Sequence, residues 1–327
     1  MHTTSQNDLD LITEFCAQAD VTDATRTKYR FHLTEFAQWL EHPKSRSSAG
    51  GGLENATKAD VVRHMAYLLA GDRFASTQAA GTTLCAASRK SVIGSLQAFY
   101  RYTVDVAICD VDPVRGVERP KTPVRRGHCL TASEVRRLLA VPGKPRDRIQ
   151  TYLLTYTGAR AGELRDLRWH DIDFPERTIL LRGKSPRPRV IDIHPRLMSE
   201  LRRWFLYVEQ RAEYNPAIAI ALRDPDSDFV LTTNTGRQIA KTAIWKQLKD
   251  RAVRAGLGEK DPQTGQVRSK VTPHTMRRTF ATILLNDGHH LDAVADVLGH
   301  ESVDTTRKHY AFSSNARRRA TIYGYNP

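Results

Sequence analysis

The stretch VTPHTMRRTFATILLNDGHHLDAVADVLGHESVDTTRKHYA, residues 271–311, decides the fold and carries most of the candidate chemistry. It brings together two histidines, an arginine and a tyrosine: His274, Arg277, His300 and Tyr310. Thr272 and Pro273 have the pattern of an N-cap and a first helical residue, so we predict that a helix begins at Pro273. His274 then lies in the first turn, and Arg277 follows three residues later on the same face.

The start of this helix suits phosphoryl chemistry. A helix N-terminus favours an anion and disfavours an imidazolium, so we predict a neutral His274 that accepts a proton beside the Arg277 guanidinium. The alternative is a surface helix with scattered bases. His300 ends the LGH turn after an apolar helix, where it donates to a phosphate oxygen or only caps that helix.

Two more candidates lie far upstream. Arg160 follows Gly158 at the predicted start of a helix, where a guanidinium can bind a phosphate with two hydrogen bonds. Glu163, one turn on, would orient it, although an ordinary helical Arg–Glu pair gives the same pattern. Lys184 begins the loop of a β-hairpin that we predict over residues 177–194.

Composition bounds the function. The chain has 327 residues, enough for two domains, and its 50 Lys and Arg against 36 Asp and Glu give a net charge of +14. This charge fits a phosphate backbone as partner, and it fits a generic basic surface equally well. The four cysteines are far apart, so we predict neither a disulfide framework nor a zinc site. No apolar run reaches the roughly 20 residues that span a bilayer, and the first residues lack the apolar stretch of a secretory signal, so we expect a cytoplasmic protein.

Apolar periodicity places helices over residues 8–42, 57–71 and 88–107, which form a small helical domain of about four helices. We predict its bounds as residues 1–116. A basic linker over 117–128 contains proline and separates it from a second domain over 129–327. That domain is predicted to be mostly helical, with a small antiparallel sheet and a further short strand within 228–240. The fold class is therefore mainly α.

The sequence resembles the tyrosine recombinases, the phage-integrase family. The resemblance rests on the order and spacing of five motifs: TGARAGEL (157–164), the lysine in RGKSPRPR (182–189), HTMRR (274–278), LGH (298–300) and Tyr310. It covers the second domain, and more loosely the N-terminal helices, which look like the family's core-binding domain. It implies that the two domains clamp duplex DNA.

The resemblance also implies roles for the residues of this sequence. Tyr310 would attack the scissile phosphate to give a 3′-phosphotyrosyl link, Lys184 would protonate the departing 5′-oxygen, and the remaining four would bind or activate the phosphate: Arg160, His274, Arg277 and His300. Tyrosine has an ordinary pKa of about 10, so a base and neutralising charges are needed. We expect no metal and no nucleotide cofactor. The expected partners are double-stranded DNA, further copies of the chain in a tetramer on two paired sites, and accessory DNA-bending proteins.

The sequence departs from the family pattern in two places. Arg278 stands where the family often has histidine, and Tyr310 follows His300 by ten residues where many members have nine. One extra residue would rotate a side chain by about 100° on an ideal helix, so a loop has to absorb it.

Several alternatives remain open. Arg187 and Arg189 compete with Lys184, and Tyr323 and Tyr325 compete with Tyr310. The short tail that ends the chain either docks in a neighbouring copy or contacts DNA through Arg317, Arg318 and Arg319. The rival functions are DNA relaxation of the type IB topoisomerase kind and DNA binding without catalysis.

Overall fold

A computed structural model describes residues 4–42, 45, 52–71, 83–122, 127–183, 188–262 and 264–299. The chain divides into two compact units, Met1–Val124 and Arg125–Pro327. The buried apolar residues of the first unit form one cluster, and those of the second unit form two others. Each unit therefore has a core of its own.

The first unit is helical. Its helices are α1 (Gln6–Gln18), α2 (Asp23–Glu41), α3 (Lys58–Ala70) and α4 (Ala86–Asp105), with a 3-10 turn, η2, at Leu53–Asn55. The region predicted as helical over 8–42 is thus two helices. Phe15, Phe36 and Phe99 are buried at the centre of the unit, and the Phe15 and Phe99 rings meet edge to face at 5.5 Å.

The start and end of α3 follow directly from its sequence. Thr57 Oγ1 accepts a hydrogen bond from the Asp60 backbone N–H at 3.3 Å, and the Asp60 carboxylate accepts one from the Thr57 backbone N–H at 2.8 Å. This reciprocal pair satisfies two backbone donors that the first turn leaves open. Gly71 ends the helix in a left-handed conformation, with φ of 82°. The predicted N-cap and C-terminal glycine are confirmed.

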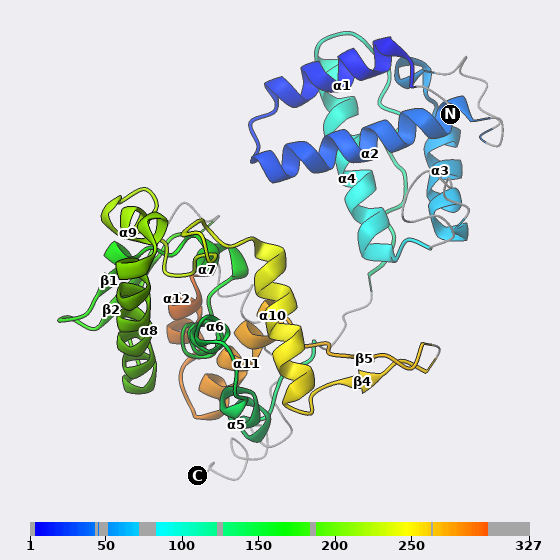
Figure 1. The fold of residues 1–327 in the computed structure, drawn as a ribbon. Helices are drawn as coiled ribbons and strands as arrows, with labels where there is room; N and C mark the ends of the chain where they lie inside the picture. The colour runs from blue at the N-terminus through cyan, green and yellow to red at the C-terminus, as the bar shows by residue number, and fades with distance from the viewer. Residues whose placement is uncertain are drawn as a thin grey trace, which may run out of the picture. The chain divides into compact units, whose positions relative to one another are not determined.

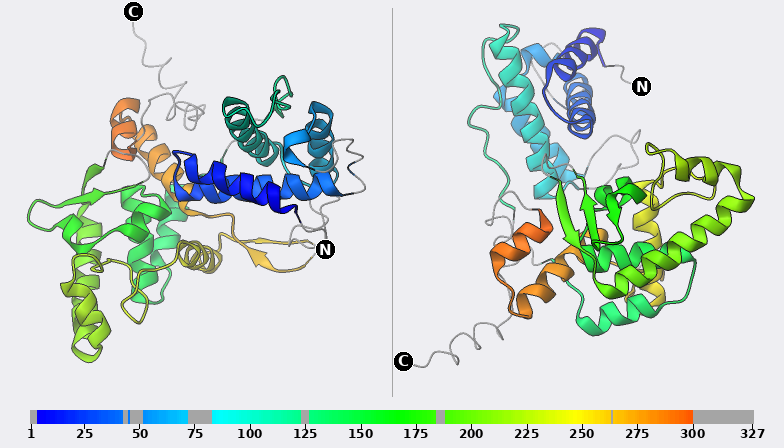
Figure 2. Two further views of the ribbon diagram at one scale, coloured as in Figure 1. Left: turned by 90° about the horizontal axis from the view of Figure 1, so that it is seen from above. Right: turned by 90° about the vertical axis from the view of Figure 1, so that its left-hand side faces the viewer.

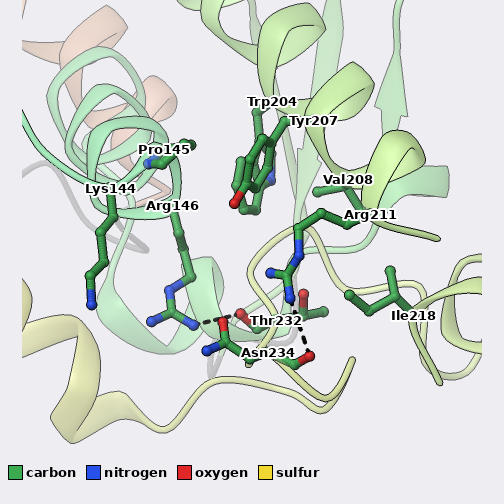
Figure 3. Close-up of a pocket in the computed structure, with 10 residues that line it drawn as sticks. All are labelled: Lys144, Pro145, Arg146, Trp204, Tyr207, Val208, Arg211, Ile218, Thr232 and Asn234. Carbon is green, nitrogen blue, oxygen red and sulfur yellow. Dashed lines mark hydrogen bonds between the residues drawn. The ribbon is translucent and has the colours of Figure 1, made fainter. Parts of the chain in front are cut away.

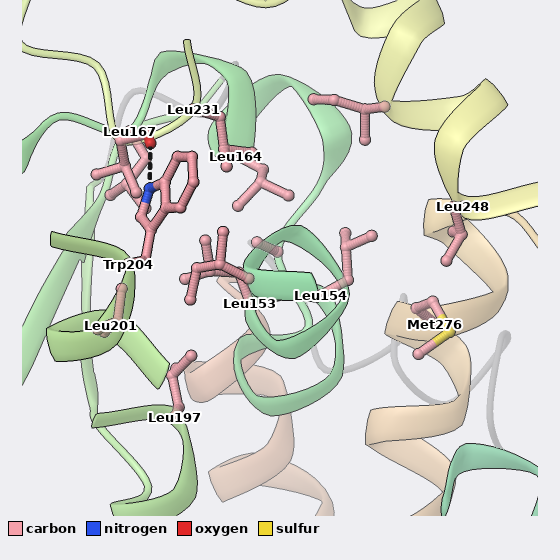
Figure 4. Packing of buried hydrophobic residues seen from close by; sticks show 14 of the residues in the cluster. Leu153, Leu154, Leu164, Leu167, Leu197, Leu201, Trp204, Leu231, Leu248 and Met276 are labelled. Carbon is pink, nitrogen blue, oxygen red and sulfur yellow. Dashed lines mark hydrogen bonds between the residues drawn. The ribbon is translucent and has the colours of Figure 1, made fainter. Parts of the chain in front are cut away.

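The second unit is built around α6 (Pro145–Thr157), which packs against helices on several sides (Figure 1). The other helices are α5 (Ala132–Ala140), α7 (Ala161–Asp166), α8 (Pro195–Tyr214), α9 (Pro216–Arg223), α10 (Lys241–Arg254), α11 (Pro273–Asn286) and α12 (Leu291–Leu298), with a 3-10 turn, η3, at Trp169–Asp171. Leu153 and Leu154 of α6 point into the main core between α8 on one side and α10 and α11 on the other (Figure 4). Each fully buried leucine contributes roughly 2 kcal/mol.

A small antiparallel sheet covers part of this unit. Its strands are β1 (Ile172–Asp173), β2 (Thr178–Leu181) and β3 (Arg189–Asp192), in the order β1-β2-β3. Ile179 pairs with Ile191, and both side chains are buried. The hairpin predicted over 177–194 is confirmed. Its loop, 184–187, lies outside the described residues.

Two features differ from the prediction. The segment 228–240 forms only isolated bridges, Arg168 with Phe229 and Thr232 with Gln238, so the short strand predicted there is wrong. A second hairpin, β4 (Glu259–Lys260) and β5 (Val267–Arg268), was not predicted. It projects from the helices of its unit (Figure 1; Figure 2, left). Its strands are exposed and two residues long, so they carry no alternation of apolar and polar side chains.

Candidate active site

The turn between α6 and α7 requires its glycine. Gly158 ends α6 with φ of 58°, and a methyl group placed on it would lie 2.7 Å from Cδ1 of Phe280. Any other residue would meet both backbone strain and a clash. This close approach sets α11, which carries Phe280, against the residues that lead into Arg160.

Arg160 is the N-cap of α7, as the sequence predicted. The Glu163 carboxylate accepts the Arg160 backbone N–H at 2.8 Å and the Arg160 Nη1 at 2.7 Å. The Arg160 side chain keeps 32% exposure, whereas that of Glu163 keeps 1%. Glu163 thus holds a partly exposed guanidinium at the start of the helix.

Arg189, the first residue of β3, approaches the same carboxylate. Its Nη1 and Nη2 donate to Oε1 and Oε2 of Glu163, both at 2.8 Å. Burial alone would raise the pKa of Glu163. The hydrogen bonds and charge of Arg189, together with the hydrogen bonds of Arg160, outweigh burial and lower this pKa to about 2. Glu163 is therefore a carboxylate at every physiological pH.

The first turn of α11 forms as predicted. Thr272 is its N-cap and accepts a hydrogen bond from the Thr275 backbone N–H at 3.1 Å, with Pro273 as the first helical residue. His274 is exposed, and the ring of Trp245 on α10 meets it edge to face with 6.3 Å between centroids. An exposed imidazole at a helix start is accessible to a substrate.

Arg277 lies one turn further along α11 and is almost fully buried, at 4% exposure. Its Nη1 donates to the carbonyl oxygen of Gly158 at 3.0 Å, and its Nη2 donates to that of Leu298 at 2.5 Å. A buried guanidinium needs such partners. Through these bonds Arg277 joins the turn that precedes Arg160 to the end of α12.

The predicted residues thus fall into two groups. The structure describes Arg160, His274 and Arg277 and brings their elements together around Gly158. Lys184, His300 and Tyr310 lie outside the described residues, as do Arg187 and the extra residue before Tyr310.

The chain neighbours of two of these undescribed residues are nevertheless placed. A methyl group on Gly183 would lie 2.8 Å from Oε1 of Glu163, and one on Gly299 would lie 2.9 Å from Cδ of Arg189. The residues directly before Lys184 and His300 therefore contact the same Glu163–Arg189 pair that holds Arg160.

A row of side chains on α10 was missed by the sequence reasoning. Lys241, Trp245 and Lys249 recur every four residues, share one face of the helix and line one surface hollow. A methyl group on Gly162 would lie 3.4 Å from Cε of Lys241, and Trp245 contacts His274. The row, called the α10 stripe below, therefore starts beside α7 and passes His274. Its four-residue spacing was visible in the sequence, but its place beside the site was not.

Another hollow lies at the opposite end of α6 (Figure 3). This pocket of ≈ 290 Å³ is lined by the cations Lys144, Arg146 and Arg211 and by the rings of Trp204 and Tyr207, among others. Of the predicted site residues that the structure describes, none lines it.

The described residues also bear on metal sites and on membrane spans. Within these residues no group of three or more His, Cys, Asp or Glu side chains is placed to hold a metal ion. Of the helices described, none has both the length and the apolar character needed to cross a membrane.

Comparison with protein families matches residues 128–317, more than half of the chain, to the phage integrase family. The chain belongs to the phage integrase family of tyrosine recombinases. Tyrosine recombinase XerD of Mycobacterium tuberculosis is 30% identical over 304 residues, which are 90% of this chain and 89% of that protein. Tyrosine recombinase XerD of Lacticaseibacillus casei is 28% identical over 326 residues, which are 97% of this chain and 98% of that protein.

Solved structures of other tyrosine recombinases have the same fold. The crystal structure of XerH site-specific recombinase bound to palindromic difH substrate, a post-cleavage complex, aligns with a TM-score of 0.70 and 19% identity over 99% of this chain and 90% of that one. A lambda integrase tetramer bound to a Holliday junction aligns with a TM-score of 0.66 and 17% identity over 96% of this chain and 80% of that one. The predicted fold class, mainly helical with a small antiparallel sheet, is confirmed.

Proposed function

We propose that this chain is a site-specific recombinase that cuts and rejoins duplex DNA through a 3′-phosphotyrosyl intermediate on Tyr310. The observation that carries the proposal is the convergence around Glu163. Arg160 and Arg189 bind its carboxylate, Arg277 binds the turn before Arg160, and the neighbours of Lys184 and His300 contact the pair. Residues far apart in the sequence thus meet at one end of the second unit.

The proposed reaction is an in-line displacement at phosphorus. Arg160 would bind the non-bridging oxygens, and Arg277, which is buried beside the Gly158 turn, would add positive charge. His274 would take the proton of the Tyr310 hydroxyl. The tyrosyl oxygen forms a bond to phosphorus while the bond to the 5′-oxygen breaks, and Lys184 would protonate that oxygen to leave a 5′-hydroxyl. Attack by a 5′-hydroxyl on the phosphotyrosine reverses the step and rejoins the strand. The phosphodiester bond energy is kept in the intermediate, so no nucleotide is consumed.

Duplex DNA is the proposed partner. The net charge of +14 and the α10 stripe beside His274 favour a phosphate backbone on this side of the second unit. The lambda integrase structure named above is a tetramer on a Holliday junction, and we propose the same assembly here, on two paired sites. We also propose a cytoplasmic location, where this DNA would lie.

Trapping of the covalent intermediate tests the proposal. The probe is a library of nicked duplexes with randomised arms, in which the short cleaved strand diffuses away and leaves the adduct. Wild-type protein should give a detergent-resistant adduct on selected members of the library. Tyr310→Phe should give none while it retains DNA binding, and Tyr323→Phe is the matched control that should react normally.

The same assay separates the rival functions. An adduct that survives Tyr310→Phe would contradict the assignment of the nucleophile. Relaxation of supercoiled plasmid by the monomer, without site preference, would favour a topoisomerase. Wild-type binding without any adduct would favour a DNA-binding protein that lacks catalysis.

A further inference from the structure

Arg189, the first residue of β3, donates three hydrogen bonds to groups inside the second unit. Its two terminal nitrogens bind both oxygens of Glu163, and its Nε donates to the carbonyl oxygen of Val297 at 2.9 Å. Its side chain is 10% exposed. These three bonds answer one open alternative: Arg189 is held inside the unit by Glu163 and by α12, which is a poor setting for a proton donor to a departing strand.

The Val297 bond lies at the end of a helix. The last carbonyl groups of a helix have no partner within it. In α12 the Val297 carbonyl accepts from Arg189, and the Leu298 carbonyl accepts from Arg277. A cation at this end also complements the helix dipole. Two arginines from different elements therefore hold the turn at Gly299, directly before His300.

Each oxygen of Glu163 serves both neighbouring arginines. Oε1 accepts from Nη1 of Arg160 and Nη1 of Arg189, and Oε2 accepts from the Arg160 backbone N–H and from Nη2 of Arg189. Charge-assisted bonds of this kind are the strong ones, and a carboxylate fixed by four of them cannot swing. The aim of Arg160 therefore depends on Arg189, although Arg189 itself binds no Arg160 atom.

We propose that Arg189 is a positioning residue of the recombination reaction, which fixes Glu163 to aim Arg160 and at the same time holds the α12 end that leads to His300. The proposal rests on the function proposed above. It predicts that loss of Arg189 slows strand cleavage with little effect on DNA binding.

The charged groups around Glu163 make this role of Arg189 testable through the pH dependence of the cleavage rate. Among the described residues, its charged neighbours are Arg160 on α7 and Arg189 on β3; Lys241 of α10 lies against Gly162, and Arg277 of α11 binds the Gly158 carbonyl. Without Arg189, burial is opposed mainly by Arg160, so the pKa of Glu163 rises and the carboxylate is lost at a higher pH. A protonated Glu163 no longer aims Arg160.

The experiment measures single-turnover cleavage of the nicked duplex selected by the wild-type protein, across the neutral and mildly acidic range, together with DNA affinity. Arg189→Met should cleave about 100-fold more slowly, the usual cost of a small misplacement, at nearly unchanged affinity. Its deficit relative to wild type should grow as the pH falls. In the double variant Glu163→Gln with Arg189→Met the titrating group is gone, so the deficit should be independent of pH.

Arg148→Met is the matched control. Arg148 also binds both oxygens of one carboxylate, that of Glu200, at 2.7 Å each, but it lies near the start of α6. Its loss should lower stability without any acid-dependent loss of cleavage. If Arg189→Met does not fold, Arg189→Lys carries the comparison with wild type: it keeps one cation but cannot bind both oxygens of Glu163, so it should cleave more slowly than wild type, with a deficit that grows as the pH falls.

The outcomes separate the two proposals. If the wild-type protein forms no adduct, the proposed function is wrong. If the wild-type protein cleaves normally, any of three results would overturn the role of Arg189. Arg189→Met could cleave like wild type, its deficit could be the same at every pH, or Arg148→Met could show the same dependence on pH.

Discussion

Glu163 is the residue on which the described part of the site depends. Its side chain is buried to 1% exposure between two guanidinium groups that keep it ionised. Burial of a charge is costly unless the charge is paired and hydrogen-bonded, and here both conditions hold. The carboxylate therefore contributes to folding stability as well as to the aim of Arg160.

Stability should depend on pH through this residue. The pKa of Glu163 is lowered from an ordinary 4.5 to about 2. A group whose pKa is lower in the folded state stabilises the fold fully above its unfolded pKa. The contribution here is about 3 kcal/mol. It is lost as the pH falls from about 4.5 towards 2. Glu163→Gln should be less stable than wild type in urea at neutral pH, and the gap should narrow below pH 4.5. A gap that stays constant with pH would contradict this.

At the residue scale the sequence predicted the positions whose evidence is local. Thr272 as N-cap, Pro273 as first helical residue and Arg160 at the start of a helix were all confirmed. The partners of Arg189 were not predicted, because its bonds to α7 and α12 depend on tertiary packing. The roles of the six candidate residues stay predictions.

At the scale of elements, the α6–α7 turn should not tolerate a side chain. Gly158→Ala places a β-carbon in a left-handed conformation and against Phe280, so it should cost about 2 kcal/mol or more. Gly94→Ala is the control, because Gly94 is exposed within α4 and has nothing within 4 Å of the added carbon. That change should stabilise the protein by up to about 1 kcal/mol. Denaturant unfolding measures both, and equal effects would refute the argument.

The α10 stripe should contribute to DNA affinity through phosphate contacts. Lys241→Gln and Lys249→Gln should each weaken binding to all sequences alike. Each should also make the fall of log K with log salt less steep, reducing the magnitude of the slope by about 1. Arg202→Gln, on α8 across α6 from α10, should leave the slope unchanged. Salt titrations of DNA binding measure the slopes. If both lysine variants leave the slope unchanged, the α10 stripe does not contact the DNA phosphates.

Elements were predicted correctly where their apolar pattern was long enough to repeat. Long amphipathic helices such as α8 and α10 repeat their apolar positions several times and were found. The strands β1, β4 and β5 have two residues each, too few for a period to appear. The segment 228–240 looked like a strand from its β-branched residues, but it pairs at single positions only.

At the scale of the whole molecule, the two units should fold independently, because their buried clusters share no residue. A specific protease site inserted after Lys121 allows the chain to be cut within the predicted linker. Both parts should keep their own melting transitions after the cut. DNA affinity should fall by about 10²–10⁴-fold, because the second unit no longer binds at the high effective concentration that the linker provides. Unfolding of either part on cleavage would contradict the predicted domain division.

The most direct test of the central claim is the identity of the tyrosine that bears the DNA. Trypsin separates the candidates, because residues 309–317 contain Tyr310 whereas residues 320–327 contain Tyr323 and Tyr325. Mass spectrometry of the trapped adduct, after nuclease digestion, should find the nucleotide on the peptide 309–317. A nucleotide on 320–327, or on any other peptide, would contradict the assignment of Tyr310 as the nucleophile.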